Sequence, residues 1–140
     1  MAAPKVCDMD PELKEKLKKF RFRKAKNNAA IIMKIDPKNL IVKIDEEHED
    51  MTLEEVAEEL PERQPRYVAY SCELNHGDGR ISYPLCFIFV SPEGCKPETM
   101  MMYAGSKLNV INEGKFTKDF ELREKEEMTN AWLKDRLLAK

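Results

Sequence analysis

The sequence predicts a single α/β domain in which a mixed β-sheet is covered by helices. The chain has 140 residues, which suits one domain with a sizeable core. Stretches whose apolar residues repeat with the period of a helix alternate with β-rich runs, in the order α-β-β-β-α-β-β-α-β-α. No internal repeat, low-complexity tract or linker divides them. We therefore expect one domain over residues 1–140, with its core at about 6–138.

The first helix is expected over residues 10–20. Asp10 is a suitable N-cap, and Pro11 fits the first helical position, where its missing N–H is not needed. Two leucines and a phenylalanine then recur at helical spacing. The period changes in "FRFRK", where aromatic and basic residues alternate. This alternation predicts a short strand that places Arg21 and Arg23 on one face.

A hairpin and a second helix follow. The β-rich runs at 29–35 and 40–45 are joined by "DPKN", whose proline fits the second position of a turn. "DEEHED" is expected to be an acidic loop. Thr52 then begins a helix, and Glu55 stands three residues later, which is the pattern of a capping box. Pro61 is expected to end this helix.

The second half of the chain adds another hairpin, a long helix, a short strand and a closing helix. "YVAYSCEL" and "ISYPLCFIFV" are strand-like runs on either side of "NHGDGR", whose two glycines suit a tight turn. Pro97 fits the first turn of a helix, and the next clear stop is Gly114, so this helix spans about five turns. "FTKDFEL" then favours a strand, and "MTNAWLKDRLL" favours a helix.

The composition excludes several classes of function. A formal net charge of -2 excludes a globally basic nucleic-acid-binding protein. No 18 apolar residues stand together, and the N-terminus lacks the apolar run of a signal peptide, so we expect a cytoplasmic protein without membrane insertion. The four cysteines show no C-x-x-C spacing and are expected to be free thiols.

The sequence shows no pattern typical of catalysis or metal binding. His48 and His76 lie in polar segments without a cysteine or second histidine at ligand spacing. The glycine-based motifs for phosphate binding and for an activated serine are absent, and acidic runs such as "EEVAEE" are typical of a solvated surface. We therefore expect no enzymatic activity, no cofactor and no metal.

The long helix carries two apolar stripes, although a helix on one face of a sheet needs only one. At steps of about 100°, the first stripe consists of Met102, Tyr103, Ser106 and Val110. The second stripe, on the roughly opposite side, consists of Met100, Ala104, Leu108 and Ile111, with Met101 and Lys107 at its margins. Either both stripes are buried, or the first turn is frayed, or one stripe faces a partner protein, for which the flexible methionine side chain is suited.

Several segments resemble one known family. "YAGSK" in a long helix that follows a strand end of the type "FIFVSPEG" is similar to the actin-depolymerising-factor homology domain of the cofilins. "KFRFRK", "NNAAIIMKID", "ELPERQPR", "DGRISYPLCFIF", "GCKPE" and "MMYAGSK" resemble, in the same order, the glia maturation factors within that group. The resemblance runs from about residue 6 to residue 137. It implies the cofilin-like (gelsolin-like) fold, with a central mixed sheet of about six strands flanked by helices.

The resemblance also implies a function. Glia maturation factors bind the actin-related protein 2/3 complex, inhibit nucleation of actin branches and promote debranching, and they bind actin weakly or not at all. By this resemblance the first stripe packs on the sheet. The residues expected to face the barbed-end groove of an actin-related subunit are Glu98, Met100, Met101, Ala104, Lys107, Leu108 and Ile111. A monomer is expected, located at branched actin networks such as those of the cell cortex and lamellipodia.

A second partner surface is expected away from the long helix. Arginine is favoured at protein contacts because its planar fork binds carboxylates at two points. The residues assigned to this surface are Arg21, Arg23, Arg63, Arg66, Asn75, His76, Asp78 and Arg80. The alternative for them is a solvated sheet edge. The rival for the whole chain is an ordinary cofilin-like protein that binds actin monomers and severs filaments.

Overall fold

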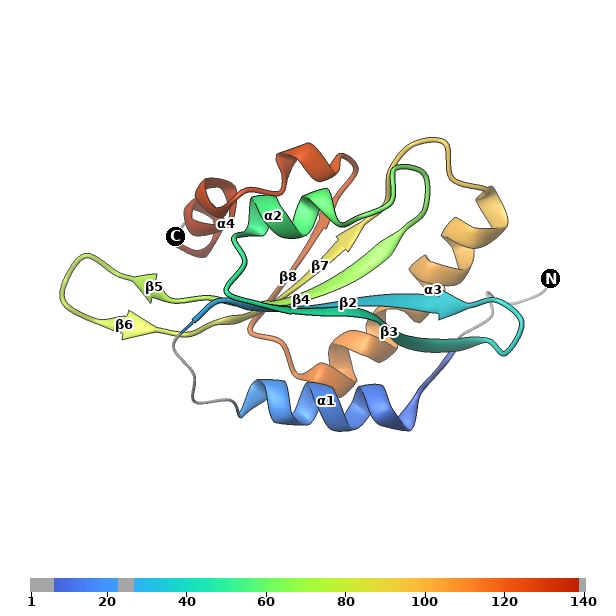
Figure 1. Ribbon diagram of the computed structural model, residues 1–140, viewed down its shortest axis with the longest axis horizontal. Coiled ribbons are helices and arrows are strands. Elements are labelled where there is room, and N and C mark those ends of the chain that lie inside the picture. Colours follow the sequence, from blue (N-terminus) through green and yellow to red (C-terminus); the bar gives the residue numbers. More distant parts are fainter. Residues whose placement is uncertain (1–6, 23–26, 139–140) are drawn as a thin grey trace.

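A six-stranded β-sheet forms the centre of the molecule, and four α-helices pack against its two faces (Figure 1). The computed structural model describes residues 7–22 and 27–138. The elements are β1 (Asp8–Met9), α1 (Pro11–Arg21), β2 (Ala29–Asp36), β3 (Ile41–Glu49), α2 (Leu53–Glu58), β4 (Arg66–Ser71), β5 (Leu74–Asn75), β6 (Ile81–Ser82), β7 (Leu85–Val90), α3 (Pro97–Gly114), β8 (Lys118–Leu122), the 3-10 helix η1 (Lys125–Glu127) and α4 (Asn130–Leu138).

The strand order of the main sheet is β1–β3–β2–β4–β7–β8. The outermost pairs, β1 with β3 and β7 with β8, are parallel, whereas the pairs between them are antiparallel. The predicted α/β domain with a mixed sheet is therefore confirmed. The strand β1 was missed, because two residues are too few to show any alternation of polar and apolar side chains.

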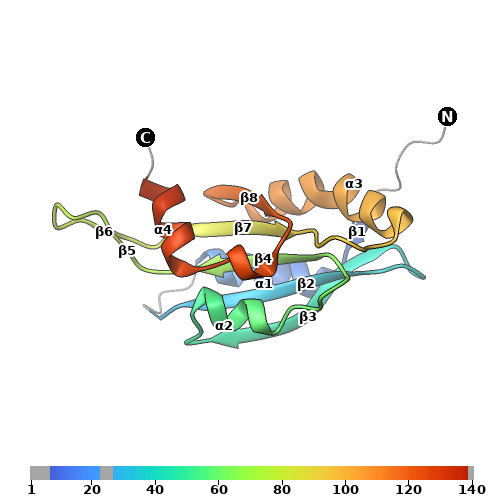
Figure 2. The ribbon, with the colours of Figure 1, turned by 90° about the horizontal axis from the view of Figure 1, so that it is seen from above.

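Each face of the sheet buries its own apolar cluster. On one face, Leu53 and Val56 of α2 and Leu133 of α4 pack on the central strands. On the other face, Leu17 of α1 and Val110 of α3 do the same. Figure 1 shows α2 and α4 above the sheet and α1 below it, and α3 runs from the right-hand end behind β2 and β3 to lie beside α1. Figure 2 shows the same molecule from above. The alternating side chains of the strands feed both clusters, as a sheet covered on both faces requires.

Helix α1 begins as predicted and ends later. Asp10 Oδ1 accepts a hydrogen bond from the backbone N–H of Glu12 at 3.0 Å, so the N-cap is confirmed. The helix continues through Arg21, and the strand predicted in "FRFRK" is wrong at that point. The reason is that half-buried Phe20 continues the leucine stripe of the helix onto the core. Arg23 lies outside the described residues.

Strand β3 is longer than predicted. It continues through Glu49, so the expected acidic loop is wrong for most of its length. Its acidic half pairs with β2, where His48 lies opposite Ala30. On its other side β1 pairs only with Ile41 and Val42, so in the described parts of the chain the rest of β3 is an edge of the sheet. Charged side chains are typical of such an edge because they discourage pairing with other chains.

The predicted capping box of α2 is confirmed. Thr52 Oγ1 accepts from the N–H of Glu55 at 3.2 Å, and Glu55 Oε1 accepts from the N–H of Thr52 at 3.0 Å. The hairpin of β4 and β7 is confirmed as well, and its tip is the separate two-stranded ribbon of β5 and β6. The tip needs its glycines, because Gly77 and Gly79 have φ values of 82° and 93°.

Helix α3 spans 18 residues, the predicted five turns. Gly114 is its last residue, although the left-handed cap with φ of 52° is the next residue, Lys115. Glycine is required at 114 because the ring of Phe116 packs directly onto its Cα, and a Cβ there would overlap that ring.

Within the described part of the chain, none of the helices is both long and apolar enough to cross a membrane. All four cysteines are free thiols, as expected.

Candidate functional site

The inner face of α3 is held to the sheet by hydrogen bonds of Tyr103. Its hydroxyl accepts from the backbone N–H of Ile35 in β2 at 2.9 Å, and its carbonyl accepts from the hydroxyl of Tyr67 in β4. The rings of Tyr67 and Tyr103 also pack together, with centroids 5.1 Å apart. Burial raises the pKa of the Tyr103 hydroxyl, so it stays neutral. These contacts fix the rotation of the helix about its own axis.

A second anchor ties α3 to the N-terminal segment. Buried Ser106 Oγ accepts from the backbone N–H of Cys7 at 2.9 Å, and Asn109 Nδ2 donates to the Cys7 carbonyl at 3.2 Å. Ser106 and Val110 are fully buried, and Met102 is half-buried on the same cluster. The stripe predicted to pack on the sheet is therefore placed as expected.

The opposite side of α3 is an exposed apolar ridge. Met101 is 59% exposed and Leu108 is 66% exposed, and they are the exposed large hydrophobic side chains of this helix. The remaining residues predicted to face a partner are arranged around them. Glu98 and Ala104 are exposed, and Met100, Lys107 and Ile111 are half-buried.

The geometry excludes two of the alternatives left open by the sequence, namely burial of both stripes and fraying of the first turn. The helix is regular from Pro97 onward, so its first turn is not frayed. Only one residue of the second stripe, Ile111, packs partly on the core cluster. Met101 and Leu108 each keep more than half of their surface exposed. We name the surface of Met100, Met101, Ala104, Lys107, Leu108 and Ile111 the α3 ridge.

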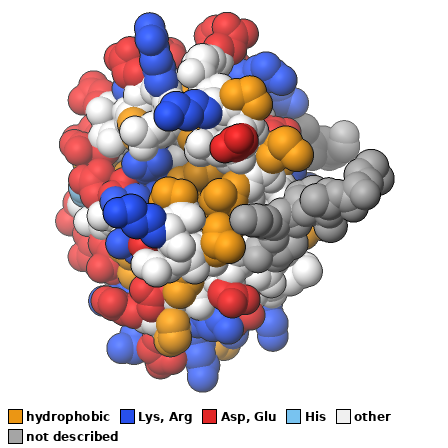
Figure 3. Space-filling view, turned by 90° about the vertical axis from the view of Figure 1, so that its right-hand side faces the viewer, with side chains coloured by type: hydrophobic (Ala, Val, Ile, Leu, Met, Phe, Trp, Pro, Cys, Tyr) orange, Lys and Arg blue, Asp and Glu red, His pale blue; other side chains and the backbone are white. Residues whose placement is uncertain are grey.

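A cationic groove adjoins the beginning of the α3 ridge. It has a volume of about 710 Å³, and Met102 and Thr99 of α3 contribute to its lining. Its lining also includes Lys34, Lys43, Arg63 and Lys96, which come from four separate segments. Figure 3 views this end of the molecule and shows hydrophobic side chains exposed beside lysines and arginines. No sequence signal pointed to this groove, because only the fold brings its residues together.

The predicted second surface is divided in two by the fold. Arg66 is the first residue of β4, and the last residue of that strand, Ser71, is about 17 Å away at 3.3 Å per residue. The hairpin of β5 and β6 lies beyond Ser71. Arg63 lines the groove beside α3, so it adjoins the first surface instead of the hairpin. The fold therefore places Arg63 and Arg66 apart from the hairpin residues of the predicted second surface.

Arg66 is a structural residue. It is buried, and its guanidinium donates from Nε to Asp45 Oδ2 at 3.1 Å and from Nη1 to the Pro65 carbonyl at 2.8 Å. Its Nη2 donates to Gln64 Oε1 at 3.1 Å. Asp45 also lies 3.4 Å from Lys34 Nζ. A guanidinium engaged by these partners offers few donors to another protein, and sequence alone cannot reveal such partners.

The β5–β6 hairpin keeps four of the predicted residues together. It projects from one end of the molecule (Figure 1, Figure 2). Its turn is ordered by its own hydrogen bonds, since Arg80 Nε donates to Asp78 Oδ2 at 2.9 Å and His76 Nε2 lies 2.8 Å from Ser82 Oγ. Asn75 Oδ1 accepts from the N–H of Gly77 at 2.9 Å. These bonds prearrange the turn, which lowers the entropy that a partner must remove on binding.

Two further features lie at the end of the molecule that carries the hairpin. Helix α1 ends there (Figure 1), and the Arg21 guanidinium lies 4.7 Å from the ring centre of Phe22, which is exposed. In the hairpin, Ile81 is 51% exposed, and Tyr83 just after it is also exposed. Ile81 was not among the predicted contact residues, although an isoleucine directly after a polar turn is a detectable signal.

Comparison with known proteins agrees with this architecture. Residues 6–138 match the family model described as cofilin/tropomyosin-type actin-binding protein. Glia maturation factor beta of Homo sapiens is 57% identical over 132 residues, which cover 94% of this chain and 93% of the relative. Glia maturation factor of Drosophila melanogaster is 45% identical over 98% of this chain and 99% of its own length.

Solved structures agree as well. The solution structure of glia maturation factor from Caenorhabditis elegans has a TM-score of 0.84 at 37% identity, over 97% of this chain and 99% of that one. A cofilin from Streptomyces griseoflavus shares the fold, with a TM-score of 0.80 over 93% of this chain and 96% of that one, at 18% identity. By family model, sequence identity and fold, this chain belongs to the cofilin/tropomyosin-type actin-binding proteins and, within them, to the glia maturation factors.

Proposed function

We propose that this chain binds the actin-related protein 2/3 complex, inhibits branched actin nucleation and promotes debranching of actin networks. The observation that carries the proposal is the α3 ridge, an apolar surface on a helix whose rotation is fixed by Tyr103. Exposed apolar side chains on a rigid helix suit insertion into a hydrophobic groove. The groove proposed is the one at the barbed end of an actin-related subunit.

The charge at the start of α3 supports a partner other than actin itself. Cofilins carry basic residues just before their tyrosine motif, whereas this chain has Glu98, Thr99 and Met100 there. Of these, Glu98 is exposed, and Thr99 and Met100 are half-buried. An acidic and an apolar residue in place of basic ones weaken attraction to an acidic partner and favour an apolar one. We therefore propose weak or no direct binding of actin by a monomeric chain.

The mechanism proposed is competition combined with a shift between two states. The α3 ridge occupies the groove that the first actin of a daughter filament would use. The β5–β6 hairpin and the end of α1 with Arg21 form the second contact and favour the conformation of the complex that holds a branch poorly. Differential affinity for two conformations is sufficient, so no bond-breaking chemistry by this chain is required.

Imaging of branched networks tests the proposal. Preformed branches are observed by fluorescence microscopy while the protein is added, and branch loss and filament severing are counted separately. We expect branches to be lost with intact filaments, and we expect Met101→Asp to abolish this effect, because a carboxylate would be desolvated in an apolar groove. Severing of unbranched filaments by the wild type would contradict the proposal.

Cosedimentation with bare actin filaments separates the proposal from the cofilin-like alternative. The family description supports actin binding in general, so this alternative has its own basis. We expect little of the chain to pellet with filaments unless the actin-related complex is present. Stoichiometric pelleting without the complex would favour the cofilin-like function.

A further inference from the structure

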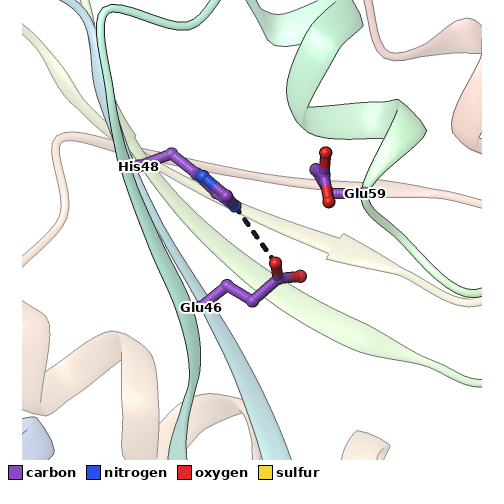
Figure 4. A group of neighbouring side chains, drawn as sticks. All are labelled: Glu46, His48 and Glu59. Carbon is purple, nitrogen blue, oxygen red and sulfur yellow. Dashed lines mark ion pairs between the residues drawn. The ribbon is translucent and has the colours of Figure 1, made fainter.

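Three potential metal ligands meet between the edge strand of the sheet and α2. Glu46 and His48 lie two residues apart on β3, so their side chains point to the same face. Glu59 follows the last residue of α2, which packs on that face. Figure 4 shows the imidazole and the two carboxylates pointing toward one another. One potential ligand atom from each side chain lies within 4.8 Å of the others.

The imidazole of His48 lacks the partner that a buried nitrogen needs. Its Nε2 is buried from solvent and makes no hydrogen bond. It lies 3.5 Å from Glu46 Oε1, which is close enough for an ion pair but leaves the hydrogen bond unmade. Native structures rarely leave a buried polar atom in this way without a ligand, an ion or an ordered water.

We propose that Glu46, His48 and Glu59 bind a divalent transition metal, with Zn²⁺ as the best-fitting ion. One imidazole nitrogen and two carboxylate oxygens are a ligand set that Zn²⁺ accepts, and the fourth position then holds water. Bonds of about 2.1 Å in tetrahedral geometry place neighbouring ligand atoms about 3.4 Å apart. The observed 3.5 Å between His48 Nε2 and Glu46 Oε1 matches one edge of that tetrahedron.

Glu59 completes the site by a small movement. Its side chain is exposed, and no hydrogen bond or ion pair with another described residue holds its carboxylate. To close the tetrahedron it must move from at most 4.8 Å to about 3.4 Å from the other ligands, which a long and free side chain can do. The two carboxylates supply charges of −2 in total, which neutralise the ion.

The site would join α2 to the edge of the sheet. The short helix α2 has six residues, and β3 has no strand neighbour beyond Val42 on its outer side in the described parts of the chain. An ion held by both elements stabilises the folded state, because unfolding separates its ligands. The role proposed for the ion is structural. The site lies apart from the α3 ridge, because α2 and α3 pack on opposite faces of the sheet. Failure of this inference would therefore leave the proposed function untouched.

Titration of the full chain with Zn²⁺ tests the inference. Isothermal titration calorimetry in a buffer that does not chelate metals, with a non-thiol reductant, is expected to show one equivalent bound. Thermal unfolding is expected to shift to higher temperature with Zn²⁺. Co²⁺ in place of Zn²⁺ is expected to give the visible absorption of a tetrahedral site.

Matched variants assign the binding to these residues. His48→Ala and Glu59→Gln are expected to weaken Zn²⁺ affinity at least tenfold and to remove the thermal shift. Glu59→Gln keeps the size of an exposed side chain, so it leaves the fold intact if His48→Ala does not. His76→Ala removes the other histidine of the chain, and Cys95→Ser removes the least buried thiol, and both are expected to bind as the wild type does.

Two results would overturn the inference. One is the absence of stoichiometric binding by the wild type at millimolar Zn²⁺. In that case His48 Nε2 would be satisfied by the ion pair with Glu46 or by a bound water, and the residues would not form a metal site. The other is binding that persists undiminished in both His48→Ala and Glu59→Gln, which would place the ion elsewhere in the molecule.

Discussion

Truncation of the two most exposed side chains of the α3 ridge should weaken partner binding without weakening the fold. In the double variant Met101→Ala, Leu108→Ala, the helix keeps its anchors on the sheet, because neither side chain contributes to the buried cluster. Alanine is also favourable within a helix. We expect the free energy of unfolding to change by no more than about 0.5 kcal/mol, as is usual for surface substitutions.

The loss of affinity follows from the exposed fractions. Complete burial of a methionine or leucine side chain contributes about 1.5–3 kcal/mol. Met101 is still 59% exposed, so its burial by a partner can add about 0.9–1.8 kcal/mol to the binding free energy. Leu108 is 66% exposed, so its burial can add about 1–2 kcal/mol. Their sum of about 2–4 kcal/mol corresponds to roughly 25- to 700-fold in affinity. The true loss is smaller than this range, because alanine keeps the Cβ and its contact with the partner. We therefore set the expected loss of affinity at about tenfold or more.

The assay is binding of the fluorescently labelled chain to the purified actin-related protein 2/3 complex, followed by anisotropy. Leu138→Ala is the control, since it truncates an exposed leucine at the end of α4, away from the α3 ridge. It should bind like the wild type. Affinity of the double variant within threefold of the wild type would refute the assignment of the α3 ridge as a contact. A large drop in melting temperature would show instead that these side chains belong to the core.

Three further predictions concern the fold. Tyr103→Phe leaves the N–H of Ile35 without its acceptor, so the free energy of unfolding measured in urea should fall by about 1–3 kcal/mol; an unchanged midpoint would show that water replaces the hydroxyl. Gly114→Ala places a Cβ in the space of an aromatic ring and should cost about 1–3 kcal/mol in the same assay, whereas a neutral effect would mean that the ring moves freely. Burial raises the pKa of the Cys86 thiol from 9.0 to about 12, so the folded state holds this proton more tightly than the unfolded state. This contribution to stability is complete below pH 9.0 and is lost as the pH rises toward about 12. Alkylation near pH 8 should therefore label half-buried Cys95 well before buried Cys86. Mass spectrometry of the labelled peptides measures the order, and labelling of Cys86 first would contradict this reasoning.

The local elements could be predicted where a short-range signal sets them. The N-cap at Asp10, the capping box of Thr52 and Glu55 and the bounds of α3 depend on residues within one turn of each other, and all are confirmed. Prediction failed where the signal is short or ambiguous. The alternation in "FRFRK" covers too few residues to separate the period of a strand from that of a helix, and the acidic half of β3 is polar because it lies at an edge.

The placement of the candidate site followed a similar division. The sequence showed two apolar stripes on one helix, but it could not decide which stripe is covered. The anchors of Tyr103 and Ser106 decide it, and their partners, Ile35 and Cys7, stand 68 and 99 residues away in the chain. The burial of Arg66 depends in the same way on distant groups, here Asp45.

By itself, the sequence determined the order of the four α-helices and of the five longer strands, the α/β class and the two apolar stripes of α3, because these depend on periodicity and on neighbours close in the chain. Only the tertiary structure decided which face of α3 stays exposed, how the arginines are divided between two ends, and that Glu46, His48 and Glu59 converge. The physical reason is that burial and side-chain proximity arise from contacts between elements that are remote in sequence, and no local pattern records them.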